Sequence, residues 1–141
     1  DAVRRAVGRT GADEALRGFL LQRLEECTSL PLQFREKLDR AVRGAFELAR
    51  AVARDAARER HARIAASALY NAASAAMLAW EATRPGVDAR RALVARFVLE
   101  HRLEAADPLN PRDDRWEREA IALLLDRSPV ALDRASALLI A

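Results

Sequence analysis

The feature that most constrains the fold is an alanine-rich stretch without glycine or proline, ARIAASALYNAASAAMLAWEAT, from Ala62 to Thr83. Its alanines recur at spacings of three and four residues, which places them on one face of an α-helix; they are Ala65, Ala68, Ala72, Ala76 and Ala79. A second apolar row lies beside them and comprises Leu69, Ala73, Met77 and Trp80. A helix that is apolar over most of its circumference is typically buried. We therefore predict that this stretch is the central helix of a bundle.

The composition favours an all-α fold for the whole chain. The 141 residues include only five glycines and five prolines, and 51% of them are hydrophobic and 32% charged. A chain of this length is long enough for one domain with its own core. We predict a single helical bundle domain of five or six helices over residues 1–141. Because the sequence begins at Asp1 rather than at methionine, we expect it to be a fragment or a subunit of a larger protein.

The central helix is expected to be preceded by a turn. Apolar residues follow a helical period from Pro31 onwards, but the pattern disappears in the charged segment RDAARERHAR, residues 54–63. One unbroken helix from Pro31 to Thr83 would be about 75 Å long, which is more than a bundle of this size can bury. We therefore predict a turn near Arg58 to His61.

Local signals also mark the later helix starts. Pro85-Gly86 is the clearest turn signal, and Asp88 is placed to cap a helix that runs to about Ala105. A further helix is expected from Asp113 or Asp114 to Asp126. The last helix is expected to start at Ser128-Pro129, with the serine as its cap and the proline in its first turn.

Cysteine and histidine usage gives no indication of a metal or nucleophilic centre. Carboxylate-bridged metal pairs in helical bundles need Glu-x-x-His on two helices, and this spacing does not occur in the sequence. We therefore expect no metal site, a solvated His61, and a His101 that is a rim or core residue rather than a ligand. Cys27 is the single cysteine, so it is expected to be a small buried hydrophobic residue in a reducing, cytoplasmic protein.

The charge pattern argues against a nucleic-acid partner, and the short apolar runs argue against a membrane-spanning helix. The net charge is only +3, and acidic residues are interspersed with basic ones, whereas a nucleic-acid-binding module usually segregates its charge. No apolar run reaches the roughly 20 residues that a membrane helix needs. The predicted helix 88–105 carries several arginines, which are expected to be solvated and paired with Glu100 and Glu104, or else to contact phosphate: Arg90, Arg91, Arg96 and Arg102.

The segment from Ala62 to Leu109 resembles the C-terminal helical domain of actinobacterial acyl-CoA dehydrogenase-like flavoproteins. The resemblance lies in SALYNAASAAMLAWEA, in DARRALVARFVLEHRL after a short turn, and in the DPL at Asp107 to Leu109. Members of this family combine an N-terminal helical domain, a middle β-domain and a C-terminal four-helix bundle. They bind FAD, oxidise acyl thioesters and assemble as dimers or tetramers through the bundle.

The resemblance implies that this chain is one part of an enzyme and is not self-sufficient on its own. The chain would be the C-terminal bundle, or a partner subunit, of an FAD-dependent oxidoreductase, and it would wall the flavin or acyl pocket and mediate oligomerisation. Trp80 would form part of the wall, and Arg84, Arg90 and Arg91, near the Pro85-Gly86 turn, would contact a cofactor phosphate. No residue matches the family's catalytic glutamate motif, so the catalytic residues are unknown.

A second class of function stays open on the sequence alone. A non-catalytic helical interaction or dimerisation domain, such as the ligand-binding domain of a TetR-like repressor, would also be rich in alanine and arginine, although no helix-turn-helix pattern is found. In either class we expect self-association, and the resemblance implies a flavoprotein partner as the alternative. The predicted helix 88–105 motivates this expectation, because its sequence is apolar on two sides.

Overall fold

The computed structural model describes residues 11–105, 107, 109 and 113–140, and every structural statement below concerns these residues. They contain six α-helices and no strand, with 78% of the residues helical, which confirms the predicted all-α bundle. The helices are α2 (Ala12–Glu25), α3 (Leu32–Arg54), α4 (Ala62–Ala82), α5 (Arg90–Val98), α6 (Arg115–Leu125) and α7 (Leu132–Leu139). A 3-10 turn, η1 (Ala56–His61), joins α3 to α4, and a π-helical turn, η2 (Leu99–Leu103), follows α5.

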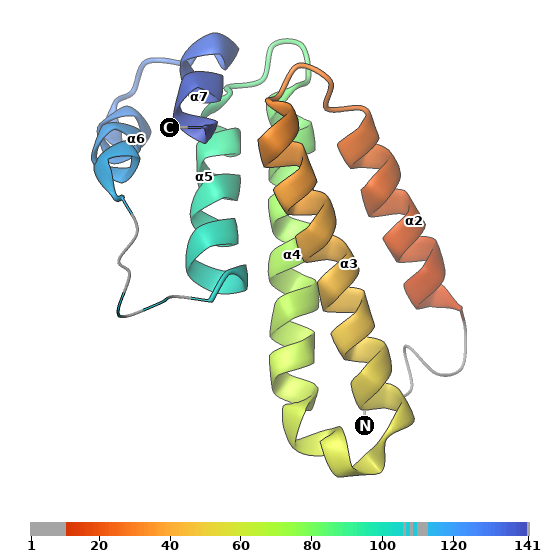
Figure 1. Ribbon diagram of the computed structural model, residues 1–141. Coiled ribbons are helices and arrows are strands. Elements are labelled where there is room, and N and C mark those ends of the chain that lie inside the picture. The colour runs from red at the N-terminus through yellow and green to blue at the C-terminus, as the bar shows by residue number, and fades with distance from the viewer. Residues whose placement is uncertain (1–10, 106, 108, 110–112, 141) are drawn as a thin grey trace.

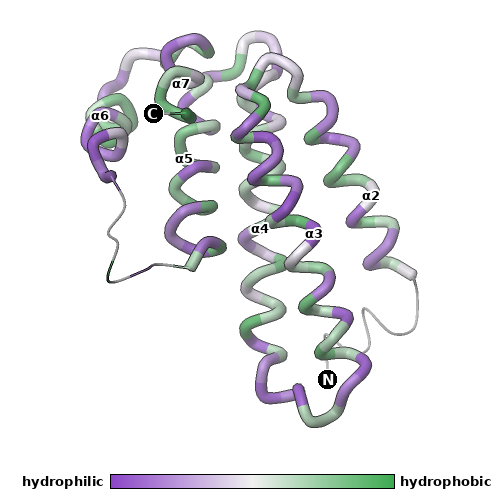
Figure 2. Tube along the Cα trace, in the orientation of Figure 1, coloured by the Kyte–Doolittle hydropathy of each residue, from purple (hydrophilic) through white to green (hydrophobic). Residues whose placement is uncertain are grey.

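The helix α4 is central to the bundle, as predicted. It packs against α2, α3, α5 and η2, whereas α6 and α7 pack against α5 instead (Figure 1). The tube of Figure 2 is mostly green to pale along α4, while α3 alternates between hydrophilic and hydrophobic residues turn by turn. The buried face of α4 is almost entirely alanine, which allows close approach of the neighbouring backbones: Ala65, Ala72, Ala75, Ala76, Ala79 and Ala82.

The predicted enclosure of α4 on nearly all sides is wrong for its N-terminal half. There Ile64 and Tyr70 are exposed by 59% and 72%, and Arg63, Ala66 and Ser67 are also exposed. The physical reason is the length of α5 and η2, which meet α4 about midway along it, so that α3 and α4 extend beyond them (Figure 1).

The charged segment between α3 and α4 forms the predicted turn. Asp55 leaves the helical conformation, with φ −123° and ψ 111°, and its Oδ1 accepts a hydrogen bond of 2.9 Å from the backbone N–H of Ala57. This side chain starts η1, which ends at His61, so the turn covers the predicted positions. Because η1 reverses the chain direction, α3 and α4 pack antiparallel over the length of the hairpin.

The predicted helix 88–105 is divided into α5 and η2, and its second apolar side is covered by the chain itself. α4 packs against one side of α5, and α7 and α6 pack against the other. Leu138 and Leu139 of α7 are buried in the same core. Much of the apolar surface that motivated the expected self-association of this helix is therefore covered within the chain, while Val94, Phe97 and Val98 are half-buried.

Asp88 joins two helix starts. Its Oδ1 accepts from the backbone N–H of Arg90, at 2.9 Å, and from that of Val130, at 3.1 Å. Because Val130 is held here and its carbonyl accepts from Ala89 N–H at 3.1 Å, α7 begins only at Leu132. The predicted cap at Ser128-Pro129 is therefore wrong.

We expect Asp88→Ala to lower the free energy of unfolding by about 1–2 kcal/mol, because both backbone donors lose their acceptor. Burial raises the pKa of Asp88, but the hydrogen bonds from Arg90 and Val130 and the Arg90 guanidinium outweigh it, so the pKa is lowered overall. A lowered pKa in the folded state means that the ionised carboxylate stabilises the protein above the unfolded pKa of about 4, and that this contribution is lost as the pH falls through the folded value.

Urea unfolding at neutral and acidic pH measures both effects. Asp88→Asn is the matched control, because the amide keeps an acceptor oxygen but does not titrate. It should lose less stability than Asp88→Ala at pH 7 and should show a smaller loss between pH 5 and pH 2 than the wild type. Equal unfolding midpoints for Asp88→Ala and the wild type would contradict the capping role.

Candidate functional site

The predicted site residue Trp80 belongs to a tight cluster at the C-terminal ends of α2 and α4. Its indole Nε1 donates a hydrogen bond of 2.7 Å to Oε2 of Glu26. The guanidinium groups of Arg23 and Arg84 lie over its ring, 5.0 Å and 4.7 Å from the centroid. The bond from Trp80 is the largest cause of the lowered pKa of Glu26, which Arg23 and Arg84 lower further and burial opposes. The cluster therefore holds Trp80 in one orientation.

Cys27 lies beside this cluster and is fully buried, as predicted. Its Sγ donates to the backbone carbonyl of Arg23 at 3.1 Å. Burial is the largest cause of the raised pKa of the Cys27 thiol, which outweighs the opposing effect of a bond with Thr83. A thiol with a raised pKa is protonated at neutral pH and is a poor nucleophile. Cys27 is therefore a packing residue.

The other predicted site residues do not join this cluster as a set. Arg84 does so, with Nη1 3.9 Å from Oε2 of Glu26. Arg90 instead pairs with Asp88 at 2.7 Å and donates to the carbonyl of Ser128 at 2.7 Å. Arg91 pairs with Glu81 at 2.7 Å. The three arginines thus face different partners around the Pro85-Gly86 turn, and each already interacts with groups of its own chain.

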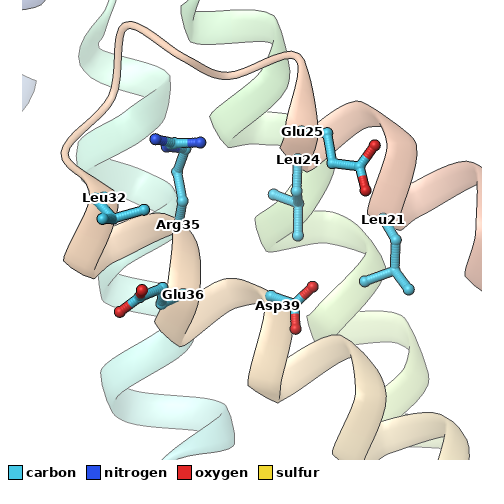
Figure 3. Close-up of a pocket in the computed structure, with 7 residues that line it drawn as sticks. All are labelled: Leu21, Leu24, Glu25, Leu32, Arg35, Glu36 and Asp39. Atoms are coloured by element: carbon cyan, nitrogen blue, oxygen red, sulfur yellow. The ribbon is translucent and has the colours of Figure 1, made fainter.

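A shallow groove lies between α2 and α3, near the turn that joins them (Figure 3). Its volume is about 160 Å³, below the roughly 300 Å³ at which small-molecule pockets begin. Its lining combines leucines with acidic side chains and one arginine: Leu21, Leu24, Glu25, Leu32, Arg35, Glu36 and Asp39. Because most of these charges are negative, the groove is unsuited to a cofactor phosphate.

Two further hollows are lined in part by η2 and share Leu103. The Leu48 hollow has a volume of about 350 Å³ and is lined by Leu48, Arg63, Ile64, Ser67, Ala68, Arg102 and Leu103. The Ala41 hollow has a volume of about 240 Å³ and is lined by Lys37, Arg40, Ala41, Leu99, Leu103 and Glu104. η2, which contributes to both linings, follows α5 directly, and the α3–α4 pair extends beyond it (Figure 1).

The arginines of these hollows differ from most others in the protein. Most arginines of the described part pair with a carboxylate or a backbone carbonyl of the same chain. Within that part, those that make no such contact are Arg40, Arg54, Arg60, Arg63, Arg102 and Arg127. Three of them, Arg40, Arg63 and Arg102, line the two hollows. The single acidic lining residue is Glu104, which lies 3.9 Å from Nζ of Lys37.

Sequence reasoning missed this cationic region. In the sequence, Arg102 is only one of several arginines around a predicted helix, and Arg63 is only part of the charged turn. The two come together because η1 folds α4 back along α3 and because η2 ends beside α4. No local sequence motif indicates that Arg63 and Arg102 line the same hollow.

The histidines are not placed as ligands. His101 stacks on Phe97, with ring centroids 5.8 Å apart, and its Nε2 lies 2.9 Å from Oε1 of Glu117, at the rim of the core as predicted. Among the described residues there is no group of three or more His, Cys, Asp or Glu side chains that could hold a metal ion. None of the helices in the described part of the chain has both the length and the apolar character required to span a membrane.

Comparisons with known proteins assign no family to the chain. A scan against protein-family models, a search of curated proteins and a search of solved structures each find no match. Of the DPL that contributes to the resemblance, Pro108 lies outside the described residues.

Proposed function

We propose that this chain is the C-terminal helical bundle, or a bundle-only partner subunit, of an acyl-CoA dehydrogenase-like flavoprotein. The observation that carries the proposal is the packing of the two segments in which the resemblance lies. SALYNAASAAMLAWEA lies within α4, and DARRALVARFVLEHRL covers α5 and η2. α4 packs along both α5 and η2, so the resemblance falls on one continuous unit at the centre of the bundle.

In this proposal the bundle supplies a wall and an assembly surface, and the rest of the enzyme supplies the reacting groups. A flavin performs the hydride chemistry, while the protein positions it and excludes water. The three hollows described above, of about 160, 240 and 350 Å³, lie below or near the lower end of the range for small-molecule pockets, so a cofactor as large as FAD would lie between the bundle and another domain. The fixed Trp80 with Arg84 is the part of the wall that this chain would offer, and homo-oligomers would form through the bundle.

Reconstitution with the remainder of the enzyme tests the proposal. We expect the chain alone to show no dehydrogenase turnover and no flavin spectrum. Co-expression with the flavoprotein encoded beside it, or with the preceding domains of the same gene, should give a complex that retains FAD and reduces it with an acyl thioester. Trp80→Ala should lower FAD retention in that complex, while Tyr70→Ala, an exposed aromatic on the same helix, serves as the control.

The competing assignment predicts a different result. If the chain belongs to a repressor-like interaction domain, the full-length gene will encode a DNA-binding helix-turn-helix and no flavoprotein will co-purify. Either finding would contradict the flavoprotein assignment.

A further inference from the structure

We propose that the two hollows beside η2 form a docking surface for an acidic amphipathic helix of a partner protein. The surface comprises the Leu48 hollow and the Ala41 hollow, which share Leu103 in their linings. The inference goes beyond the proposed function and does not depend on a flavin. It rests on the shape, the charge and the exposure of this one region.

The shape fits side chains of a helix better than it fits an enclosed small molecule. Small-molecule pockets bury most of their ligand. Here the apolar lining is open to solvent, and Ile64 at the edge of the Leu48 hollow is 59% exposed. Leu103 lines both hollows, and each hollow offers further apolar contacts to an aliphatic side chain, from Leu48 and Ile64 in one and from Ala41 and Leu99 in the other.

The spacing of the hollows predicts the spacing of the anchors. On α3, Ala41 lines one hollow and Leu48 lines the other, seven residues along the same helix. At 1.5 Å per residue this is about 10 Å along the helix axis. A partner helix that runs along α3 therefore presents two aliphatic side chains at positions i and i+7, which lie on one face two turns apart.

The charge of the rim selects an acidic partner. Arg63 and Arg102 flank the Leu48 hollow, and within the described part of the chain neither makes a hydrogen bond or an ion pair. Lys37 and Arg40 flank the Ala41 hollow, where Glu104 is the only acid. Guanidinium groups bind carboxylates in a bidentate geometry, so Glu or Asp residues beside each anchor would complement this rim.

The placement in the fold supports a helical occupant. α5 and η2 cover the half of α4 nearer the Pro85-Gly86 turn, and no other helix of the described residues covers the remaining α3–α4 pair on this side (Figure 1). Tyr70 and Ile64 are exposed on that uncovered part of α4. A helix docked there would occupy a position that the chain's own shortened helix leaves open.

Synthetic peptides test the inference directly. The probe is a fluorescent helical peptide of about 20 residues, with leucines at i and i+7, glutamates flanking each leucine and alanines elsewhere. Two matched peptides replace either all glutamates by lysine or both leucines by alanine. Fluorescence anisotropy should show that the glutamate peptide binds at least about tenfold more tightly than either control peptide, and that raising NaCl from 50 to 500 mM weakens it by about tenfold.

Protein variants assign the binding to this surface. Arg63→Glu with Arg102→Glu should weaken binding of the glutamate peptide by about tenfold or more, because two attractive charges become repulsive. Arg127→Glu with Arg54→Glu is the matched control, since it makes the same change of charge at two other arginines that form no ion pair in the described part of the chain and that do not line either hollow. Ile64→Ser should also weaken binding through its exposed apolar contact, and circular dichroism verifies that all variants stay folded.

Three results would overturn the inference. One is equal affinity for the glutamate and lysine peptides. Another is an equal loss of affinity in the Arg63/Arg102 and Arg54/Arg127 variants, since binding would then reflect net charge alone. The third is binding to phosphatidylserine vesicles, lost in the Arg63/Arg102 variant, without measurable peptide binding, because the surface would then contact a membrane instead.

Discussion

Replacing Ala76 by glutamate is expected to destabilise the protein by more than about 4 kcal/mol, because the new carboxylate is placed where no solvent reaches it. Ala76 has 0% of its surface exposed and lies on the alanine face with which α4 contacts its neighbouring helices. Domains of this size have a total stability of about 5–15 kcal/mol. The substitution therefore removes most or all of it.

A variant on the same helix provides the control. Ala66→Glu introduces the same charge and the same change in helix propensity, but residue 66 is exposed. Thermal melting followed by circular dichroism should show a cooperative transition close to that of the wild type for Ala66→Glu, and a transition lowered by tens of degrees or absent for Ala76→Glu. If Ala76→Glu, or the double variant with Ala72→Glu, melts within about one degree of the wild type, the central position of α4 is wrong.

The position of α4 could be predicted because the pattern that indicates it lies within one continuous stretch of sequence. A stretch without helix breakers and with alanines at helical spacing identifies both its extent and its buried face, and the structure gives Ala62–Ala82 for the predicted 62–83. The turn before it was equally local, since the apolar pattern stops in a charged segment and Asp55 supplies the cap. Both features depend on residues that are close in sequence.

The errors arise where distant segments decide the outcome. The predicted start of α7 is wrong because Oδ1 of Asp88, 42 residues away in the sequence, accepts a hydrogen bond from the backbone N–H of Val130. The packing of α6 and α7 on the second side of α5 could not be predicted either, because periodicity reveals an apolar surface but not which helix covers it. The hollows beside η2 could not be predicted for the same reason, since α3, α4 and η2 each contribute part of their lining.

Arg96 illustrates the same limit of prediction from sequence, since its ion-pair partner was predictable but its burial was not. The sequence suggested an exposed arginine paired with Glu100, and the pair is present, with Nε 2.7 Å from Oε1. The expected solvation is wrong, because the two side chains are only 8% and 7% exposed. The helices α6 and α7 cover Arg96: its Cζ lies 3.9 Å from the ring centroid of Trp116, and its Nη1 donates to the carbonyl of Leu138.

Arg96→Ala is therefore expected to lower the free energy of unfolding by about 3–5 kcal/mol, the range found when one partner of a buried ion pair is removed. The substitution leaves the Glu100 carboxylate buried without this guanidinium and deprives the Leu138 carbonyl of its donor. It also removes the cation–π contact that joins α5 to α6. All three losses loosen α6 and α7 from α5.

Two further variants distinguish the loss of stability caused by breaking the buried ion pair from the loss caused by removing any arginine. Arg91→Ala removes an arginine whose ion pair with Glu81 is solvent-exposed, and it should change stability by no more than about 0.5–1 kcal/mol in urea unfolding. The double variant Arg96→Met with Glu100→Leu should be more stable than Arg96→Ala, because apolar side chains of similar volume leave no buried charge. An Arg96→Ala protein that unfolds at the same urea concentration as Arg91→Ala would show that the pair contributes no more than a surface contact, and that packing of α7 and Trp116 alone holds the C-terminal helices in place.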